Sequence, residues 1–535
     1  MKANTIFTAI ICLVLTFGMN SCSDNKQTVE ETKPNILFIM ADDHAVAAIS
    51  AYKDWLSEIA PTPNIDRIAK NGMLMTRTFN TNSICGPSRA AILTGKYGHE
   101  SRFFKNEKGG DFDGSQQTFP KILQKNGYQT AVIGKWHLGT APTGFDYSKV
   151  MINWGGQGTY FNPVFLENGK DTMVEKTRHS TAQVAHDAIK WLDQGRDKTK
   201  PFMLMYQFKA PHRPWEPAPE FQKLFQEDLP HPANFNDDYK GRKAASKQWM
   251  EIENHMNRKD LKVYPKEKLT PRELNTYNAF GNKGQFWTPH DSLQGAALKN
   301  WKYQTYIKDY LRCVAGVDKA VGQMLDYLKA NDMLDNTVIV YTSDQGFYLG
   351  EHGWFDKRFM YEESFRMPFM ISYPEMIKPG TTNDNLLLNI DFAPTLLDLA
   401  GIETPKDMQG TSFKNQLSPN IEAQGRDAIY YHYYEFPKWH NVEPHYGVRT
   451  DRYKLIHFYY SMDEWELFDL DNDKHEMNNL YGKPGYEEIT AALKKRIKEL
   501  QVEFKDDMSL EEMRAMTDMV VERVYSEENI NKAIK

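Results

Sequence analysis

Apolar runs and amphipathic segments follow one another along most of the chain. Six runs rich in aliphatic and aromatic residues predict strands, at 34–40, 73–80, 130–133, 201–206, 337–341 and 365–373. Segments with helical spacing of apolar residues or with helix start and stop signals lie between them, at 62–70, 85–95, 118–124, 181–194, 303–331 and 391–400. Because strands that alternate with helices build a parallel sheet covered on both faces, the pattern predicts a doubly wound α/β sheet.

The pattern changes near residue 426. Short aromatic strands in hairpin-like order are predicted at 429–434, 446–450, 453–459 and 466–469, followed by a helix at 486–504. Residues 217–299 instead show clusters of proline, aromatic and charged residues with no strand pattern, and they predict an insertion of loops and short helices near the mouth of a pocket. We therefore expect a main domain at 34–425 and a C-terminal subdomain at 426–535.

The first 22 residues have the pattern of an export signal. Lys2 supplies the charge, 6–17 form an apolar run that is short for a membrane span, and the run is followed by Met19-Asn20-Ser21-Cys22. This end resembles a bacterial lipobox, which would make Cys22 a lipidated first residue; the alternative is an ordinary cleaved signal. Residues 23–33 are polar and predict a tether. We expect a protein in the periplasm or at the cell surface, bound to the membrane by its N-terminal lipid at most.

Composition and charge argue against a nucleic-acid-binding protein and against a fold held together by disulfides. The 535 residues carry a net charge of −6, and the 25% of charged residues mix both signs without a basic stripe, which excludes nucleic acid as an expected partner. Of the four cysteines, Cys12 and Cys22 belong to the signal region. The remaining two, Cys85 and Cys313, do not form an obvious disulfide set, and Cys313 lies on an apolar helical pattern that predicts buried packing.

Polar residues that could bind a metal or an anion, or transfer a proton, follow several predicted strands. Asp42 and Asp43 come directly after the first run, and adjacent carboxylates repel each other unless a cation lies between them, for which Ca²⁺ or Mg²⁺ is suited; a solvated turn is the alternative. Lys135 and His137 follow the run at 130–133 and would face the same way in an extended segment, presenting a cation and a proton acceptor to an anion. His212 lies between two prolines, on a loop stiff enough to hold its ring.

The stretch from Cys85 to Gly95 reads CGPSRAAILTG. Pro87 suits the first turn of a helix, which places Cys85 just before a helix N-terminus. Backbone N–H groups and the helix dipole would there favour a thiolate, so one interpretation is a reactive cysteine of low pKa.

A second interpretation comes from the spacing. Cys-x-Pro-Ser-Arg-x-x-x-Leu-Thr-Gly resembles the signature of the type I sulfatases, in which the cysteine is oxidised to Cα-formylglycine by a sulfatase-maturing enzyme. The string GKWHLG at 134–139 resembles the second motif of that family. The resemblance covers nearly the whole chain after the signal. It implies an alkaline-phosphatase-like sandwich, with a large mixed sheet between helices and a small C-terminal subdomain containing a four-stranded antiparallel sheet.

The resemblance also implies a metal centre. Asp42, Asp43 and Asp344 match the metal-binding carboxylates, and Cys85, once oxidised, would join them around Ca²⁺, with Mg²⁺ as the less favoured ion. The position after Asp344 is usually Asn or His in the family, whereas this chain has Gln345, whose amide oxygen reaches out on a longer arm.

Catalytic roles follow from the same resemblance. One hydroxyl of the hydrated formylglycine at position 85 would attack sulfur with the help of Arg89, and His212 would protonate the leaving alcohol. His137 would then deprotonate the other hydroxyl, which expels sulfate and restores the aldehyde. The expected sulfate-binding residues are Lys135, Lys357 and Lys209.

The substrate is predicted from one segment. Residues 342–368 look most like bacterial sulfatases that act on 6-O-sulfated N-acetylglucosamine, as in heparan-type or mucin glycans. Asp356 and Arg358 flank Lys357 and would suit sugar hydroxyls, or they form a local ion pair. The alternatives are another sulfated sugar, such as 6-sulfated N-acetylgalactosamine or a uronate 2-sulfate, a phosphate or phosphonate monoester, and a non-catalytic glycan-binding protein.

Overall fold

A computed structural model describes residues 33–106, 111–151, 157–257, 260–262, 293–418, 425–437 and 440–521. Its contacts separate residues 1–33 from one compact unit, 34–535. The predicted signal, Cys22 and all of the tether except Lys33 lie outside the described residues, as do 263–292 of the predicted insertion. Within the described ranges, no helix combines the length and the apolar character that a membrane span needs. The domain boundaries stay predictions.

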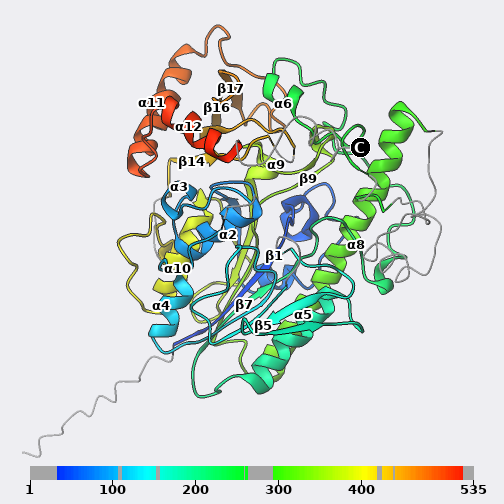
Figure 1. The fold of residues 1–535 in the computed structure, drawn as a ribbon, viewed down its shortest axis with the longest axis vertical. Helices are drawn as coiled ribbons and strands as arrows, with labels where there is room; N and C mark the ends of the chain where they lie inside the picture. Colours follow the sequence, from blue (N-terminus) through cyan, green and yellow to red (C-terminus); the bar gives the residue numbers. More distant parts are fainter. Residues whose placement is uncertain are drawn as a thin grey trace, which may run out of the picture. The chain divides into compact units, whose positions relative to one another are not determined.

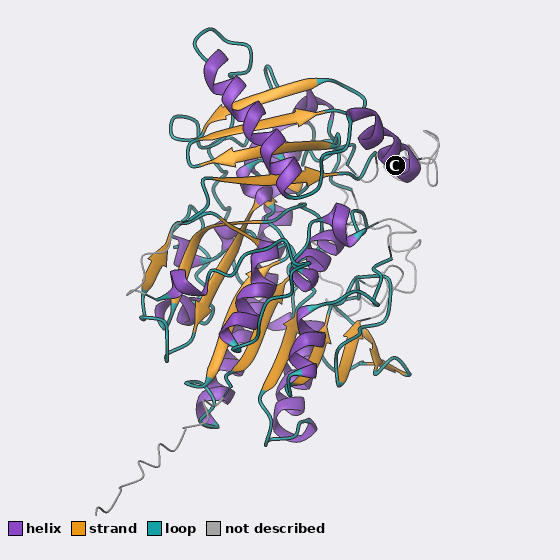
Figure 2. Ribbon diagram, turned by 90° about the vertical axis from the view of Figure 1, so that its left-hand side faces the viewer, coloured by secondary structure: helices purple, strands orange, loops and turns teal. Residues whose placement is uncertain are grey.

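A large mixed sheet forms the centre of the main body, as the sequence predicts (Figure 2). Its strands run in the order β12-β2-β11-β8-β1-β7-β3-β4-β5-β6, with β13 beside β2. The four central strands β8, β1, β7 and β3 are parallel, whereas β11 is antiparallel to both its neighbours. The strand bounds are Asn35–Ala41 (β1), Met73–Phe79 (β2), Gln129–Gly134 (β3), Tyr147–Met151 (β4), Val164–Glu167 (β5), Asp171–Val174 (β6), Phe202–Gln207 (β7), Thr337–Ser343 (β8), Arg366–Ser372 (β11), Thr381–Asn383 (β12) and Leu387–Leu388 (β13).

Helices cover both faces of this sheet (Figure 1). Ile36, Phe38 and Met40 of β1 pack in one apolar cluster with the first set of helices, while Leu37 and Ile39 pack in another with the second set. Because successive side chains of a strand point to opposite faces, an uninterrupted apolar run is what such a covered strand needs. The first set comprises α2 (Cys85–Thr94), α4 (Phe119–Lys125) and α10 (Phe392–Leu399), and the second α5 (Ser180–Lys190) and α8 (Gly295–Ala330).

The C-terminal region contains a separate antiparallel sheet of four strands, in the order β14-β15-β16-β17. The helix α11 packs against it through Leu493, Ile497 and Leu500. This arrangement confirms the predicted hairpin-like order and the helix that follows. The bounds are Ala428–Tyr433 (β14), His445–Thr450 (β15), Tyr453–Phe458 (β16), Glu464–Asp469 (β17), Glu487–Glu503 (α11) and Leu510–Val521 (α12).

The structure adds elements that the apolar pattern does not predict. Strands β4, β5 and β6 extend one end of the large sheet, and β9 (Tyr348–Leu349) pairs with β10 (Phe355–Asp356) in a short hairpin. Helix α8 begins at Gly295, about two turns before the predicted start. The other short helices that are not predicted are α3 (Gly98–Ser101), α6 (Lys243–Lys247) and α9 (Glu362–Phe365), whereas α1 (Asp66–Lys70) lies within the helix predicted at 62–70.

Candidate active site

The candidate site lies at the carboxyl ends of the central parallel strands. Asp42 and Asp43 follow β1 directly, Lys135 follows β3, and Asp344 follows β8. Because neighbouring parallel strands end at the same edge of the sheet, residues far apart in sequence meet there. Asp43 N donates a hydrogen bond to Asp344 Oδ1 at 3.1 Å, which joins the ends of β1 and β8.

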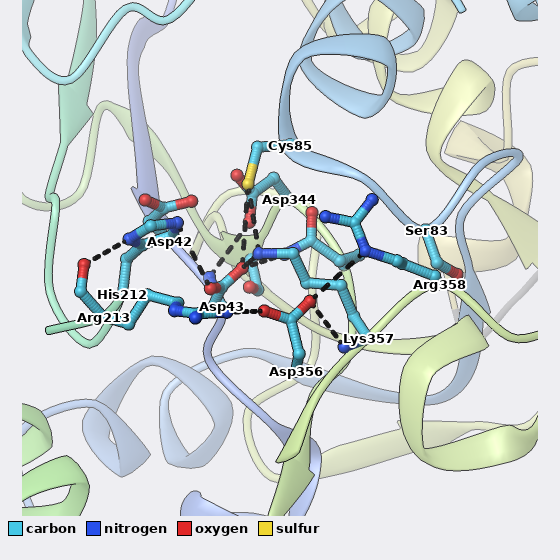
Figure 3. A network of polar contacts seen from close by, with 12 residues as sticks. Asp42, Asp43, Ser83, Cys85, His212, Arg213, Asp344, Asp356, Lys357 and Arg358 are labelled. Atoms are coloured by element: carbon cyan, nitrogen blue, oxygen red, sulfur yellow. Dashed lines mark hydrogen bonds and ion pairs between the residues drawn. The ribbon is translucent and has the colours of Figure 1, made fainter. Parts of the chain in front are cut away.

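Three carboxylates and a thiol converge at this edge (Figure 3). One ligand atom from each of Asp42, Asp43, Cys85 and Asp344 lies within 4.8 Å of the others, and all four side chains are buried. Burial and the charge of Asp42 raise the pKa of Asp344 to about 7. Burial likewise raises the pKa of Asp43 to about 6, although Lys357 opposes this. Like charges are thus held together out of water, an arrangement that a cation would relieve.

Unsatisfied oxygen atoms show that a hard cation fits this place. Among the described residues, the buried atoms Asp42 Oδ1, Asp43 Oδ2 and Gln345 Oε1 accept no hydrogen bond. Buried acceptors are normally satisfied, and carboxylate and amide oxygens are the ligands that Ca²⁺ and Mg²⁺ prefer. Gln345 Nε2 donates to Asp43 Oδ1, so the amide lies within the same group. The residues expected as metal ligands are therefore brought together.

Three buried cations balance the carboxylates. Arg89 Nε donates to Asp344 Oδ2 at 2.9 Å, and Lys135 Nζ donates to Asp42 Oδ2. Lys357 Nζ donates to Asp43 Oδ1 at 2.5 Å and lies 3.4 Å from the sulfur of the cysteine. A divalent cation added to these three pairs would give the site a positive charge, which favours an anionic ligand.

The position and burial of Cys85 contradict one of the two interpretations of its motif. The cysteine is the first residue of α2 rather than the residue before the helix, and its side chain is 1% exposed. Burial and the neighbouring Asp42 raise the pKa of the thiol well above 9, despite Lys357. The prediction of a reactive cysteine of low pKa is therefore wrong, because desolvation and a carboxylate outweigh the helix N-terminus.

Two histidines, His212 and His137, border the carboxylates. His212 Nδ1 donates to the Arg213 carbonyl oxygen at 2.7 Å, which leaves Nε2 facing Asp43 Oδ2 at 3.7 Å. His137 has a φ of 58°, so the extended geometry that was expected to align it with Lys135 is not present. Burial lowers the pKa of both imidazoles well below 6.5.

The residues around Lys357 form ion pairs within the protein. Asp356 and Arg358 have φ values of 78° and 102°, a conformation that non-glycine residues adopt at a cost and that gathers at functional sites. Arg358 Nη1 donates to Glu435 Oε1 at 2.7 Å, while Asp356 Oδ2 accepts from Arg213 Nη1 at 2.8 Å. The local ion pairs considered as an alternative are present, and the sugar-binding role stays a prediction.

Lys209 lies beside the loop of His212. Its Nζ donates to the Arg213 carbonyl oxygen at 3.2 Å and is 5.0 Å from the centroid of the Tyr160 ring. These contacts place it next to the predicted proton donor. Its role in sulfate binding is not tested by them and stays a prediction.

Sequence reasoning missed three residues that border the site. Arg213 contacts Asp356, Asp260 and His440. A signal for Arg213 was available, because it follows His212 in the same proline-flanked loop. Asp260 and His440 gave none, since their partners come from distant parts of the chain.

Comparisons with known proteins agree with this geometry. Residues 34–402 match the model of the family described as "Sulfatase", and residues 350–503 match "N-sulphoglucosamine sulphohydrolase, C-terminal". An N-acetylglucosamine-6-O-sulfatase of Bacteroides thetaiotaomicron is 46% identical over 95% of this chain and 92% of its own length. An ulvan-active sulfatase of Formosa agariphila is 28% identical over 92% of this chain and 88% of its own length.

A solved structure gives the same result. The solved protein is 46% identical to this chain. The match covers 90% of this chain and 100% of the solved chain, and the two structures superpose with a TM-score of 0.84. That protein is described in complex with its substrate, D-glucosamine-2-N,6-O-disulfate. On the family match, the identity and the shared fold, this chain belongs to the sulfatase family and is a sulfatase.

Proposed function

We propose that this sulfatase removes the 6-O-sulfate from N-acetylglucosamine or related glucosamine residues at the ends of heparan-type or mucin glycans. The observation that carries the proposal is the 46% identity, over 95% of the chain, to an N-acetylglucosamine-6-O-sulfatase. The solved relative with a 6-O-sulfated glucosamine in its site supports the same substrate class. The residues on both sides of Lys357 would then meet the sugar while Lys357 meets the sulfate.

The chain's own residues would hold the sulfate ester. Lys135 and Lys357 supply buried positive charge on two sides of the carboxylates, and Arg89 supplies a third. Asp42, Asp43, Asp344 and Gln345 would hold a divalent cation, Ca²⁺ in this proposal, which would neutralise charge on the sulfate oxygens. The unsatisfied acceptors at three of these residues support that assignment.

Proton transfer would be divided between the two histidines. Cys85, oxidised to formylglycine and hydrated, would supply the attacking hydroxyl and a second hydroxyl for release of sulfate. His212 would give the proton at Nε2 to the leaving sugar oxygen, and the anionic ester would favour the protonated imidazole that burial alone disfavours. His137, neutral in its buried position, would accept a proton in the release step.

Location is part of the proposal. We propose that the enzyme is exported and anchored by a lipid on Cys22, because the charged start, the apolar run and the small residues before Cys22 have the order of such a signal. The polar residues 23–33 would then hold the catalytic body away from the membrane.

Sulfate release from a panel of defined saccharides tests the substrate. We expect fast release from terminal 6-O-sulfated N-acetylglucosamine and a loss of about 10³-fold or more in Cys85→Ala. Mass spectrometry of the peptide containing Cys85 should show loss of the thiol and gain of an aldehyde. Faster turnover of 6-sulfated N-acetylgalactosamine, a uronate 2-sulfate or a matched phosphate ester would replace the proposed substrate, and binding without turnover would support a glycan-binding protein.

A further inference from the structure

We infer that Arg213 is a positioning residue for the reaction, because its side chain fixes the loop whose carbonyl oxygen orients His212. The inference rests on the proposed role of His212 as proton donor to the leaving sugar. It assigns a part in the chemistry to Asp260 of the predicted insertion as well, since Asp260 holds the Arg213 guanidinium.

The Arg213 side chain is clamped from two sides. Its Nε and Nη2 donate to Asp260 Oδ1 and Oδ2, each at 3.0 Å, which is the paired geometry that fits a guanidinium to a carboxylate. Its Nη1 donates to Asp356 Oδ2 at 2.8 Å, and His440 Nε2 lies 3.0 Å from the same nitrogen. Both carboxylates are at most 4% exposed. Contacts in two directions fix the plane of the guanidinium, which a lysine ammonium cannot reproduce.

The main chain of Arg213 transmits this fixation to the imidazole. Its carbonyl oxygen accepts the Nδ1 proton of His212 at 2.7 Å and a hydrogen bond from Lys209 Nζ at 3.2 Å. Because a carbonyl can only accept, Nδ1 must carry a proton, and Nε2 is the nitrogen turned toward Asp43 (Figure 3). A shift of the carbonyl would rotate the ring and move Nε2 away from the leaving oxygen.

The anchor itself is held firmly. The backbone N–H of Asp260 donates to Asn257 Oδ1 at 3.0 Å, which restrains the main chain at this residue. Two residues later, the buried Lys262 Nζ donates to the Trp215 carbonyl oxygen at 2.7 Å and pairs with Asp309 of α8 at 3.0 Å. The segment 260–262 is thus tied both to a long helix and to the loop that carries Arg213.

Leaving-group dependence separates this role from a structural one. A sugar alkoxide leaves poorly and needs a proton, whereas 4-nitrophenolate leaves well without one. A misplaced His212 should therefore slow the sugar reaction selectively. We expect Arg213→Lys and Asp260→Asn to lower kcat for a 6-O-sulfated glucosamine by about 10- to 100-fold and to change kcat for 4-nitrophenyl sulfate by less than about threefold.

A double-mutant cycle on the sugar substrate gives the second readout. If Arg213 acts through His212, adding Arg213→Lys to His212→Ala should change kcat by less than about twofold. The matched control is Arg426→Lys, which alters another paired contact, to the buried Asp391, whose side-chain hydrogen-bond partners among the described residues are Leu388, Thr411 and Arg426 rather than members of the carboxylate cluster. It should lower the melting temperature without changing kcat for either substrate.

Each other outcome is decisive. Equal losses of kcat on both substrates, or independent losses in the double variant, would overturn the inference while leaving the proposed function intact. If Arg213→Lys does not fold, Asp260→Asn carries the same test. A wild-type enzyme that does not release sulfate from 6-O-sulfated glucosamine would instead contradict the proposed function.

Discussion

Two buried groups of charge in this enzyme use the same residue type in opposite ways. Asp391, which precedes α10, is fully satisfied: Oδ1 accepts from Thr411 N at 2.8 Å and from Arg426 Nη2 at 2.5 Å. Its Oδ2 accepts from Leu388 N at 2.8 Å and from Arg426 Nη1. At the site, Asp42 Oδ1 and Asp43 Oδ2 are equally buried and accept no hydrogen bond from any residue that the structure describes.

The difference lies in what surrounds each carboxylate. Hydrogen-bond donors from the protein surround the Asp391 carboxylate, so this charge stabilises the folded state. Three carboxylates face one another at the site, and two of their oxygens, Asp42 Oδ1 and Asp43 Oδ2, find no donor among the described residues, which suits them to bind a cation. Burial alone therefore does not identify a functional carboxylate, whereas unsatisfied oxygens and facing like charges do.

The largest expected effect comes from the site. Asp43→Asn should lower kcat/KM for a 6-O-sulfated glucosamine by about 10³-fold, or about 4 kcal/mol, because it removes a proposed cation ligand and a partner of Lys357. In protein treated with a chelator, the same change should alter the free energy of unfolding by less than about 1 kcal/mol, because it also removes a repelling charge. A large loss of stability there would remove the contrast with Asp391.

The opposite result is expected at the satisfied carboxylate. Asp391→Ala should lower the free energy of unfolding by about 3 kcal/mol, because it strands Arg426 and two backbone N–H groups. Urea unfolding measures the loss, and kcat of the folded fraction should stay within about twofold of wild type. A selective loss of kcat would show that Asp391 contributes to the reaction.

A third buried ionisable group, His352, extends the comparison to the pH dependence of the free energy of unfolding. His352 lies between Asp237 and Glu363. Although burial lowers its pKa, a hydrogen bond to Asp237 at 2.6 Å and the nearby charge of Glu363, 3.7 Å from Nε2, raise it to about 9. A pKa raised above the unfolded value of about 6.5 contributes stability that is complete below pH 6.5 and is lost as pH rises through 9. The free energy of unfolding of wild type minus that of His352→Gln should therefore fall by about 2 to 3 kcal/mol between pH 6 and pH 9.5. A difference that does not vary with pH would contradict this.

The smallest effect is expected at the residue where the chain departs from its family. Gln345→Asn shortens the amide arm that now reaches Asp43, and we expect a loss of kcat/KM within about fivefold, or about 1 kcal/mol, with a matching rise in the Ca²⁺ concentration needed for half-maximal activity. Gln345→Ala should lose more. Equal activity of all three would remove Gln345 from the ligand set.

Much of this architecture is predictable from the sequence, for a physical reason. Strands β1, β7 and β8 are covered on both faces, so their apolar runs are long and unambiguous, and the residues after them are then placed by the geometry of a parallel sheet. The aromatic strands β14 to β17 are read in the same way from their turns. Asp42, Asp43 and Lys135 are found by this route, whereas Asp344 is assigned from the resemblance to the sulfatases.

Other features are not predictable because they depend on contacts between distant segments. Strand β6 is short and lies at a sheet edge with Met173 and Val174 exposed, so it lacks an apolar signal. The raised pKa of the Cys85 thiol follows from Asp42, which is 43 positions earlier, and from burial that no local pattern reveals. His440 and Asp260 meet Arg213 only in the folded chain.

The burial of Cys85 also bears on when the proposed oxidation of its thiol could take place. A side chain that is 1% exposed cannot enter the active centre of another enzyme while the surrounding fold is intact. The lysine that contacts its sulfur, Lys357, is made 272 positions later. If Cys85 is converted to formylglycine as proposed, the oxidising enzyme would have to reach the thiol before the segment that carries Lys357 folds against it.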